Sequence, residues 1–133
     1  MFIVLADHGH IICKDHSLYE HEDFFSCLSC PQFAIEGRAA SFYVKDDKKE
    51  EFNKLAHKYY GKDFDIYTKE EVKKEHIFGL GEEHERFDYA IGDFLLVSHG
   101  EAVFTQEFGA QLVSHHAGGT DLEKYVNLSI VNE

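Results

Sequence analysis

The first predicted strand of this chain leads directly into two residues that can bind a metal ion. Residues 2–6 (FIVLA) form an unbroken apolar run, which is the pattern of a strand covered on both faces. Asp7, His8 and Gly9 follow at once, and the glycine permits a turn there. Because open α/β sheets bind ligands beyond the carboxyl ends of their strands, two interpretations stay open. Asp7 and His8 either serve a site, or they mark a strand that has reached the surface and turned.

Strand and helix patterns alternate along the rest of the chain, which favours an α/β fold. Apolar runs predict strands over 39–45, 64–67, 93–98 and 126–131. Polar stretches with capping residues predict helices within 15–30, over 48–60, after Thr68 and after Thr120. No repeat or linker divides the sequence. We therefore expect residues 1–133 to form a single domain with a mixed, mainly parallel sheet flanked by helices.

The helix over 48–60 and the one after Thr68 carry the clearest local patterns. We expect Asp46 and Asp47 to cap the first and Gly61 to end it. Its apolar residues repeat at helical spacing and predict a face packed on the core, namely Phe52, Leu55, Ala56 and Tyr59. The spacing of Thr68 and Glu71 predicts a capping box.

Charge and composition limit the classes of partner. The chain has 13 Lys and Arg against 25 Asp and Glu, a formal net charge of -12. A surface this acidic repels phosphate backbones, so we expect neither nucleic-acid nor membrane binding. A bound cation would still permit a phosphate substrate, because it reverses the local charge. The 10 histidines are numerous for 133 residues and favour a metal site.

Three cysteines do not predict a disulfide framework, so we expect a reducing, cytoplasmic environment. Cys27 and Cys30 form a C-x-x-C pair, for which buried thiols are favoured over redox or zinc use. His8 and His10 form an H-x-H pair typical of metal-dependent amidohydrolase barrels. The chain is too short for such a barrel, which takes about 250 residues.

A second histidine motif lies near the end of the chain. His115 and His116 precede Ala117 and the pair Gly118-Gly119, whose turn can present an imidazole ring to a metal or an anion. Taken alone, this motif is more typical of a surface turn with incidental histidines.

Taken in order, these motifs resemble the alkaline phosphatase superfamily, in particular its type I phosphodiesterase and nucleotide pyrophosphatase branch. In that branch a strand ends in Ala-Asp-His-Gly, and much later a His beside a Gly pair precedes a Thr, an acid and a short strand. The matching residues here are Ala6-Asp7-His8-Gly9, His116 to Thr120, and Glu123 before the strand from Val126. Five intervening stretches of this chain also resemble bacterial members of the branch, namely 35–38 (IEGR), 41–45 (SFYVK), 67–71 (YTKEE), 77–81 (IFGLG) and 91–94 (IGDF).

The resemblance implies an alkaline-phosphatase-like fold and a phosphoester hydrolase with two divalent cations, zinc or manganese, of which zinc is favoured. By position, Asp7 and His8 would bind one metal and His116 the other, with His115 as the rival of His116. His10 is expected to be a bystander.

The family places its Ser or Thr nucleophile and its remaining metal ligands upstream of Asp-His-Gly, so this chain resembles a C-terminal portion. We expect no catalytic residue in it, no activity from the chain alone, and at most one weakly bound cation. A partner with the N-terminal half would supply the rest and bring a phosphoester substrate. The alternative is a non-catalytic metal-binding or interaction domain, and a strand separated from its sheet favours self-association.

Overall fold

The largest sheet of the computed structural model has four strands in the order β4–β5–β7–β6, and the structure describes residues 1–106 and 112–132. These strands are β4 (Ala34–Glu36), β5 (Ala39–Phe42), β7 (Phe94–Ser98) and β6 (Phe64–Thr68). Every neighbouring pair in this sheet is antiparallel. The predicted strands over 39–45, 64–67 and 93–98 are therefore present, with β5 ending earlier than expected.

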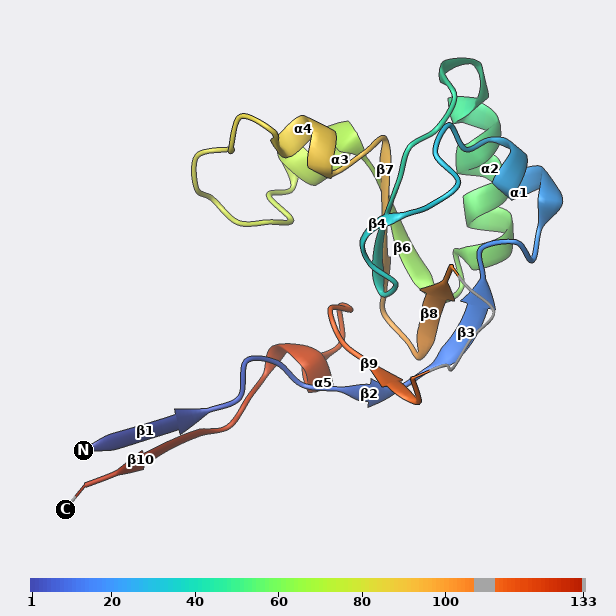
Figure 1. Cartoon of the computed structure of the whole chain (residues 1–133). Helices are drawn as coiled ribbons and strands as arrows, with labels where there is room; N and C mark the ends of the chain where they lie inside the picture. The colour runs from blue at the N-terminus through green and yellow to red at the C-terminus, as the bar shows by residue number, and fades with distance from the viewer. Residues whose placement is uncertain (107–111, 133) are drawn as a thin grey trace.

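One face of this sheet packs against α2 (Lys49–Tyr60) and α1 (Glu22–Ser26) (Figure 1). The predicted helix over 48–60 is thus present, and it ends before Gly61 as expected. Phe52, Ala56 and Tyr60 are its buried residues, whereas the predicted Leu55 and Tyr59 are partly buried at the margin of the core. The expected cap is absent, because Asp46 and Asp47 lie in the 3-10 turn η1 (Asp46–Lys48) and no side chain caps α2.

Aromatic rings make up much of the core between these helices and the sheet. Phe24, Phe42, Phe52 and Phe104 are buried and meet edge-on or tilted, the arrangement that the ring quadrupole favours. A smaller cluster of Val72, Ile91 and Leu95 lies beneath α3 (Lys69–Lys74) and α4 (Phe87–Ala90). The predicted capping box begins α3: the Glu71 N–H donates to the Thr68 hydroxyl at 3.2 Å, and the Thr68 N–H donates to the Glu71 carboxylate at 2.8 Å.

Three strand pairs continue from this body toward the chain ends. β3 (Lys14–Ser17) pairs with β8 (Ala102–Thr105), and β2 (Ile11–Ile12) pairs with β9 (Ser114–His115). Only the first of these pairs is parallel, and the other described strand pairs are antiparallel. The expected mainly parallel sheet is therefore not observed: the fold is mixed α/β with small, mostly antiparallel sheets, because β4, β5, β6 and β7 meet through reversals of chain direction.

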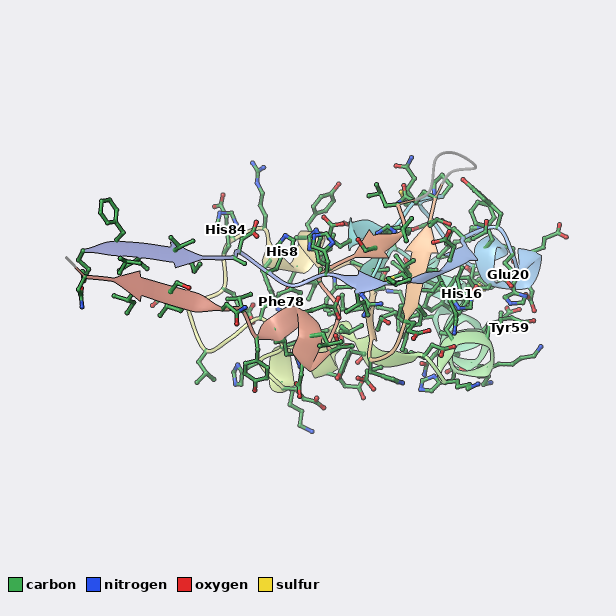
Figure 2. All side chains as sticks on the ribbon, turned by 90° about the horizontal axis from the view of Figure 1, so that it is seen from below. His8, His16, Glu20, Tyr59, Phe78 and His84 are labelled. Carbon is green, nitrogen blue, oxygen red and sulfur yellow. The ribbon has the colours of Figure 1, made fainter. Side chains whose placement is uncertain are left out.

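The last pair, β1 (Phe2–Leu5) and β10 (Leu128–Val131), forms a two-stranded ribbon that extends away from the rest of the chain (Figure 1). Its side chains project to both sides of the ribbon (Figure 2), and all eight strand residues are exposed. The prediction that 2–6 is a strand is confirmed, but its expected burial within this chain is wrong. Apolar residues on both faces still indicate a strand that needs cover.

Among the described residues, no helix has the length and apolar character needed to cross a membrane.

Candidate metal-binding site

Two distant segments of the chain bring three histidine rings together where the ribbon joins the body. His8 and His116 are stacked, with ring centroids 3.8 Å apart and an interplanar angle of 14°. The His10 ring lies 4.9 Å from that of His8 and 5.2 Å from that of His116. The structure thus places His8 beside His116, and it also brings in His10, which the sequence analysis set aside.

Asp7 and His8 form a donor pair at the edge of this cluster. The Asp7 Oδ2 lies 3.5 Å from His8 Nε2, with the Asp7 side chain 88% exposed and that of His8 32% exposed. His8 Nδ1 lies 3.1 Å from the carbonyl oxygen of Gly9. Since a carbonyl oxygen only accepts, Nδ1 donates in this contact and Nε2 faces Asp7.

The separation of these two atoms fits a shared cation. Two ligands at about 2.1 Å from a tetrahedral metal ion lie roughly 3.4 Å apart, close to the distance between Oδ2 and Nε2. The His8 N–H donates to Asp7 Oδ1 at 3.0 Å and lowers the pKa of Asp7, and the neighbouring His8 and His116 lower it further. Asp7 is therefore ionised at neutral pH, which is the form that binds a metal.

His115 lies apart from the cluster. It belongs to β9, where it pairs with Ile11, and its Nε2 is buried without a hydrogen-bond partner in the described part of the chain. His116 follows immediately and has its ring against His8. The strained backbone of Ala117, with φ 73°, comes directly after it.

The two segments of the site are fixed by a buried ion pair that the sequence analysis missed. Arg38 donates from Nε to Glu123 Oε1 at 2.6 Å and from Nη2 to Glu123 Oε2 at 2.8 Å, a bidentate contact. Arg38 is 0% exposed, and its guanidinium also donates to the carbonyl oxygens of Gly100 and Ala102. The pair therefore joins the strand connection before β5 to α5 (Asp121–Lys124), directly after the His116 turn.

Glu123 also stabilises the turn that follows His116. Its carboxylate accepts from the Gly118 N–H at 2.8 Å and from the Thr120 hydroxyl. Its backbone carbonyl accepts from the Gly9 N–H at 3.2 Å, next to His8. Burial would raise the pKa of Glu123, but the hydrogen bonds from Arg38, Thr120 and Gly118 outweigh burial and hold the pKa at about 2.

Gly9 is required by a close approach and not by a left-handed backbone. A Cβ atom on Gly9 would lie 1.9 Å from the carbonyl oxygen of Leu122. The expected role of this glycine in a turn is thus replaced by a role in packing the first segment against α5.

In the described residues, no three His, Cys, Asp or Glu side chains already converge on one point as a metal site requires. The rings of His8 and His116 lie face to face, so their nitrogen atoms do not point at a common centre. The donor types fit a cation, and a bound ion requires the rings to turn.

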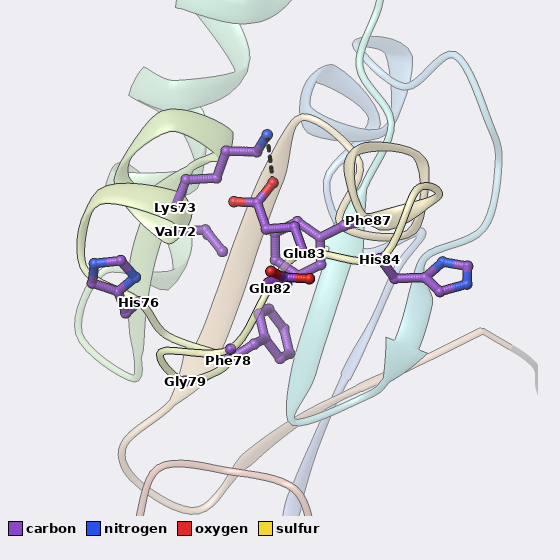
Figure 3. A pocket seen from close by; sticks show the side chains of 10 residues that line it. Val72, Lys73, His76, Phe78, Gly79, Glu82, Glu83, His84 and Phe87 are labelled. Atoms are coloured by element: carbon purple, nitrogen blue, oxygen red, sulfur yellow. Dashed lines mark ion pairs between the residues drawn. The ribbon is translucent and has the colours of Figure 1, made fainter.

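Two other features are separate from this cluster. A cavity of about 310 Å³ lies between α3 and α4 (Figure 3), where Lys73 pairs with Glu83 at 3.1 Å and also with Asp88. Its lysine is thus paired with two carboxylates, which disfavours phosphate binding at this residue. In the C-x-x-C pair, burial raises the pKa of the Cys27 thiol, which disfavours the thiolate needed for redox or zinc chemistry.

Comparison with known proteins gives matches in structure alone. No family profile and no curated protein matches the sequence. Murine ectonucleotide pyrophosphatase/phosphodiesterase 5 matches with a TM-score of 0.58 and 16% identity, over 88% of this chain and 29% of that chain. An inactive form of the murine protein in complex with AMP and the human protein match with the same TM-score and coverage at 18% identity.

This chain shares the fold of part of these structures. It spans 29% of their length. At this identity the likeness establishes the fold and not the chemistry.

Proposed function

We propose that this chain is a C-terminal segment of a metal-dependent phosphoester hydrolase of the phosphodiesterase/nucleotide pyrophosphatase type. In this proposal Asp7, His8 and His116 are metal ligands, and the Ser or Thr nucleophile comes from outside the chain. The observation that carries the proposal is the fold match to 29% of a nucleotide pyrophosphatase/phosphodiesterase, in a chain whose His8 and His116 rings stack.

The residues of this chain would bind and orient rather than react. Asp7 and His8 offer an oxygen and a nitrogen at a spacing that suits one cation, and His116 offers a ring from the opposite segment. Arg38 and Glu123 hold both segments in place. In the complete enzyme, two divalent cations, zinc in preference to manganese, would activate the nucleophile and stabilise charge on phosphorus.

The exposed ribbon indicates how the fold is completed. β1 and β10 expose apolar side chains on both faces, as strands of a larger covered sheet would if their neighbours were absent. A polypeptide with the remaining part of the fold would cover them and supply the missing ligands. The substrate is then a small phosphoester, and the free cysteines favour the cytoplasm.

A second candidate function is a non-catalytic metal-binding or interaction domain. It is favoured by the exposed ribbon, because a large exposed apolar surface marks a site of interaction. Such a domain would keep one cation and use the ribbon for association.

Hydrolysis of bis(p-nitrophenyl) phosphate with added zinc or manganese separates the two. The DNA upstream of the Met1 codon is first searched for a nucleophile motif, and any such product is co-expressed with the full chain. The proposal predicts turnover by the pair, lost in His8→Ala and retained in His57→Ala, an exposed histidine of α2.

The chain alone is expected to give no turnover. Turnover by the chain alone that His8→Ala abolishes would overturn the assignment of the nucleophile to another segment. A co-expressed pair that binds zinc without hydrolysis would instead favour the non-catalytic domain.

A further inference from the structure

The cavity between α3 and α4 has no role in the proposed function and shares no residue with the histidine cluster. Its volume is about 310 Å³, and its lining comes from the two helices and from the loop that connects them (Figure 3). This volume is at the lower end of the range for small-molecule sites. The cavity is therefore large enough for a small organic compound.

Two aromatic rings form much of the apolar part of the lining. Phe78 and Phe87 meet edge to face, with ring centroids 5.7 Å apart and an interplanar angle of 84°. Phe87 packs against the buried cluster that contains Val72, whereas Phe78 is 52% exposed. One ring is thus fixed by the core, and the other lies at the solvent side. Such rings pack on alkyl groups and attract cations to their faces.

The charged groups at the cavity favour a cation over an anion. Glu82 and Glu83 line it, and Lys73 pairs with Glu83 at 3.1 Å and with Asp88. Three carboxylates are thus present for one ammonium group. Glu82 has no lysine or arginine partner in the part of the chain that the structure describes. Its carboxylate is therefore the one available to a ligand.

The chemistry of the lining suits an organic cation better than a metal ion. In the ranges 1–106 and 112–132, no three His, Cys, Asp or Glu side chains are grouped as a metal site requires, and phenyl rings donate no lone pair. An alkylammonium compound matches both parts of the lining. Its N–H groups can donate to a carboxylate, and its carbon chain can pack on the rings.

We propose that this cavity binds a small primary ammonium compound, with the ammonium group at Glu82 and the alkyl chain against Phe78 and Phe87. This ligand site is independent of the proposed metal ligands Asp7 and His8. Failure of one assignment therefore leaves the other unaffected.

Titration of the full chain with n-butylammonium chloride at constant ionic strength tests this inference. Amide signals of Gly79 and Gly81, which line the cavity, are followed by NMR. Sodium butyrate has a similar carbon chain with the opposite charge and is the ligand control. The variants are Glu82→Gln and Phe78→Leu, with Glu85→Gln as matched control. Glu85 is an exposed acid of the same loop that lies outside the lining.

We expect butylammonium to shift both glycine signals to saturation and butyrate to leave them unchanged. Glu82→Gln should weaken binding by roughly two- to fivefold, the range for an exposed ion pair. Phe78→Leu keeps an apolar side chain and should weaken binding by a similar factor through loss of the ring. Glu85→Gln should bind like the wild type.

Circular dichroism of each variant checks that the fold is kept. The inference is wrong if butyrate binds as tightly as butylammonium, or if the signals shift without reaching saturation. Equal affinities of Glu82→Gln and Glu85→Gln would contradict the place assigned to the ammonium group.

Discussion

Arg38 and Glu123 illustrate how one buried pair can support a site at the surface. Arg38 is 0% exposed and Glu123 is 5% exposed, and their bidentate contact joins the segment before β5 to the turn after His116. Removal of either partner lowers the free energy of unfolding, because the remaining buried charge has no water to solvate it. The turn that follows His116 therefore depends on this pair for its stability.

Arg38→Met is expected to lower the free energy of unfolding by about 3–5 kcal/mol, the usual cost of leaving one buried charge unpaired. Urea unfolding measures this change. The double variant Arg38→Met/Glu123→Gln serves as control and should lose less than the sum of the two single variants, since neither charge is then left alone. Additive losses would contradict the role of the pair.

Glu123 also predicts a pH dependence. Its pKa falls from an ordinary 4.5 to about 2 in the folded chain, so between these pH values the unfolded chain binds more protons. The stability that Glu123 contributes is thus complete above pH 4.5 and is lost as the pH falls toward 2. Urea unfolding across this window should show the loss in the wild type, and Glu123→Gln should show a shallower slope. Equal slopes would contradict the low pKa.

At the residue scale, the sequence pointed to the residues of the cluster but not to the ion pair that supports it. Asp7, His8 and His116 were selected from short motifs, and the structure brings them into one cluster with His10. Arg38 could not be singled out, because its partner lies 85 residues away and no local spacing connects the two. The sequence signal for this ion pair was an arginine directly before Ala39, at the start of a strand.

The ribbon of β1 and β10 is the element whose surroundings differ most from the prediction. Ile3 and Ile130 face each other in register and are 54% and 55% exposed. The apolar run correctly predicted a strand. Its periodicity could not show that the strand is exposed in this chain, because a fully apolar strand indicates only that both faces need cover.

We expect the chain alone to self-associate through this ribbon. Ile3→Lys/Ile130→Glu should shift the chain toward monomer, since the opposite charges preserve the strand pair and remove the apolar faces. Analytical ultracentrifugation over a range of concentrations measures the shift, with Leu80→Lys, an exposed residue of a loop, as control. A wild type that stays monomeric throughout would contradict this expectation.

Elements whose sequence signals lie within a few residues of one another were predicted more accurately. The capping box of Thr68 and Glu71 needs only three residues of spacing, and α2 needs only its apolar face and Gly61. The relative direction of neighbouring strands was predicted less well, because alternating strands and helices do not determine whether neighbouring strands are parallel. Here four strands meet antiparallel around β5 and β7.

At the scale of the whole molecule, the chain has the fold of part of a nucleotide pyrophosphatase/phosphodiesterase and ends in an uncovered ribbon. The candidate site lies between β1 and β2 and directly after β9, at the end of that ribbon. The ribbon and the candidate site share chain segments. A partner that covers the ribbon and a metal ion that binds at the site would therefore contact the same segments. The resemblance in the order of the sequence motifs agrees with the structural match, although no single motif was sufficient.

The central claim is that Asp7, His8 and His116 are metal ligands. Anomalous scattering at the zinc edge, from crystals of the full chain equilibrated with zinc, tests it most directly. We predict a peak within about 2.1 Å of His8 Nε2 and of a carboxylate oxygen of Asp7, beside the His116 ring. A map with no peak at this cluster, or with zinc only on other histidines of the surface, would contradict the account.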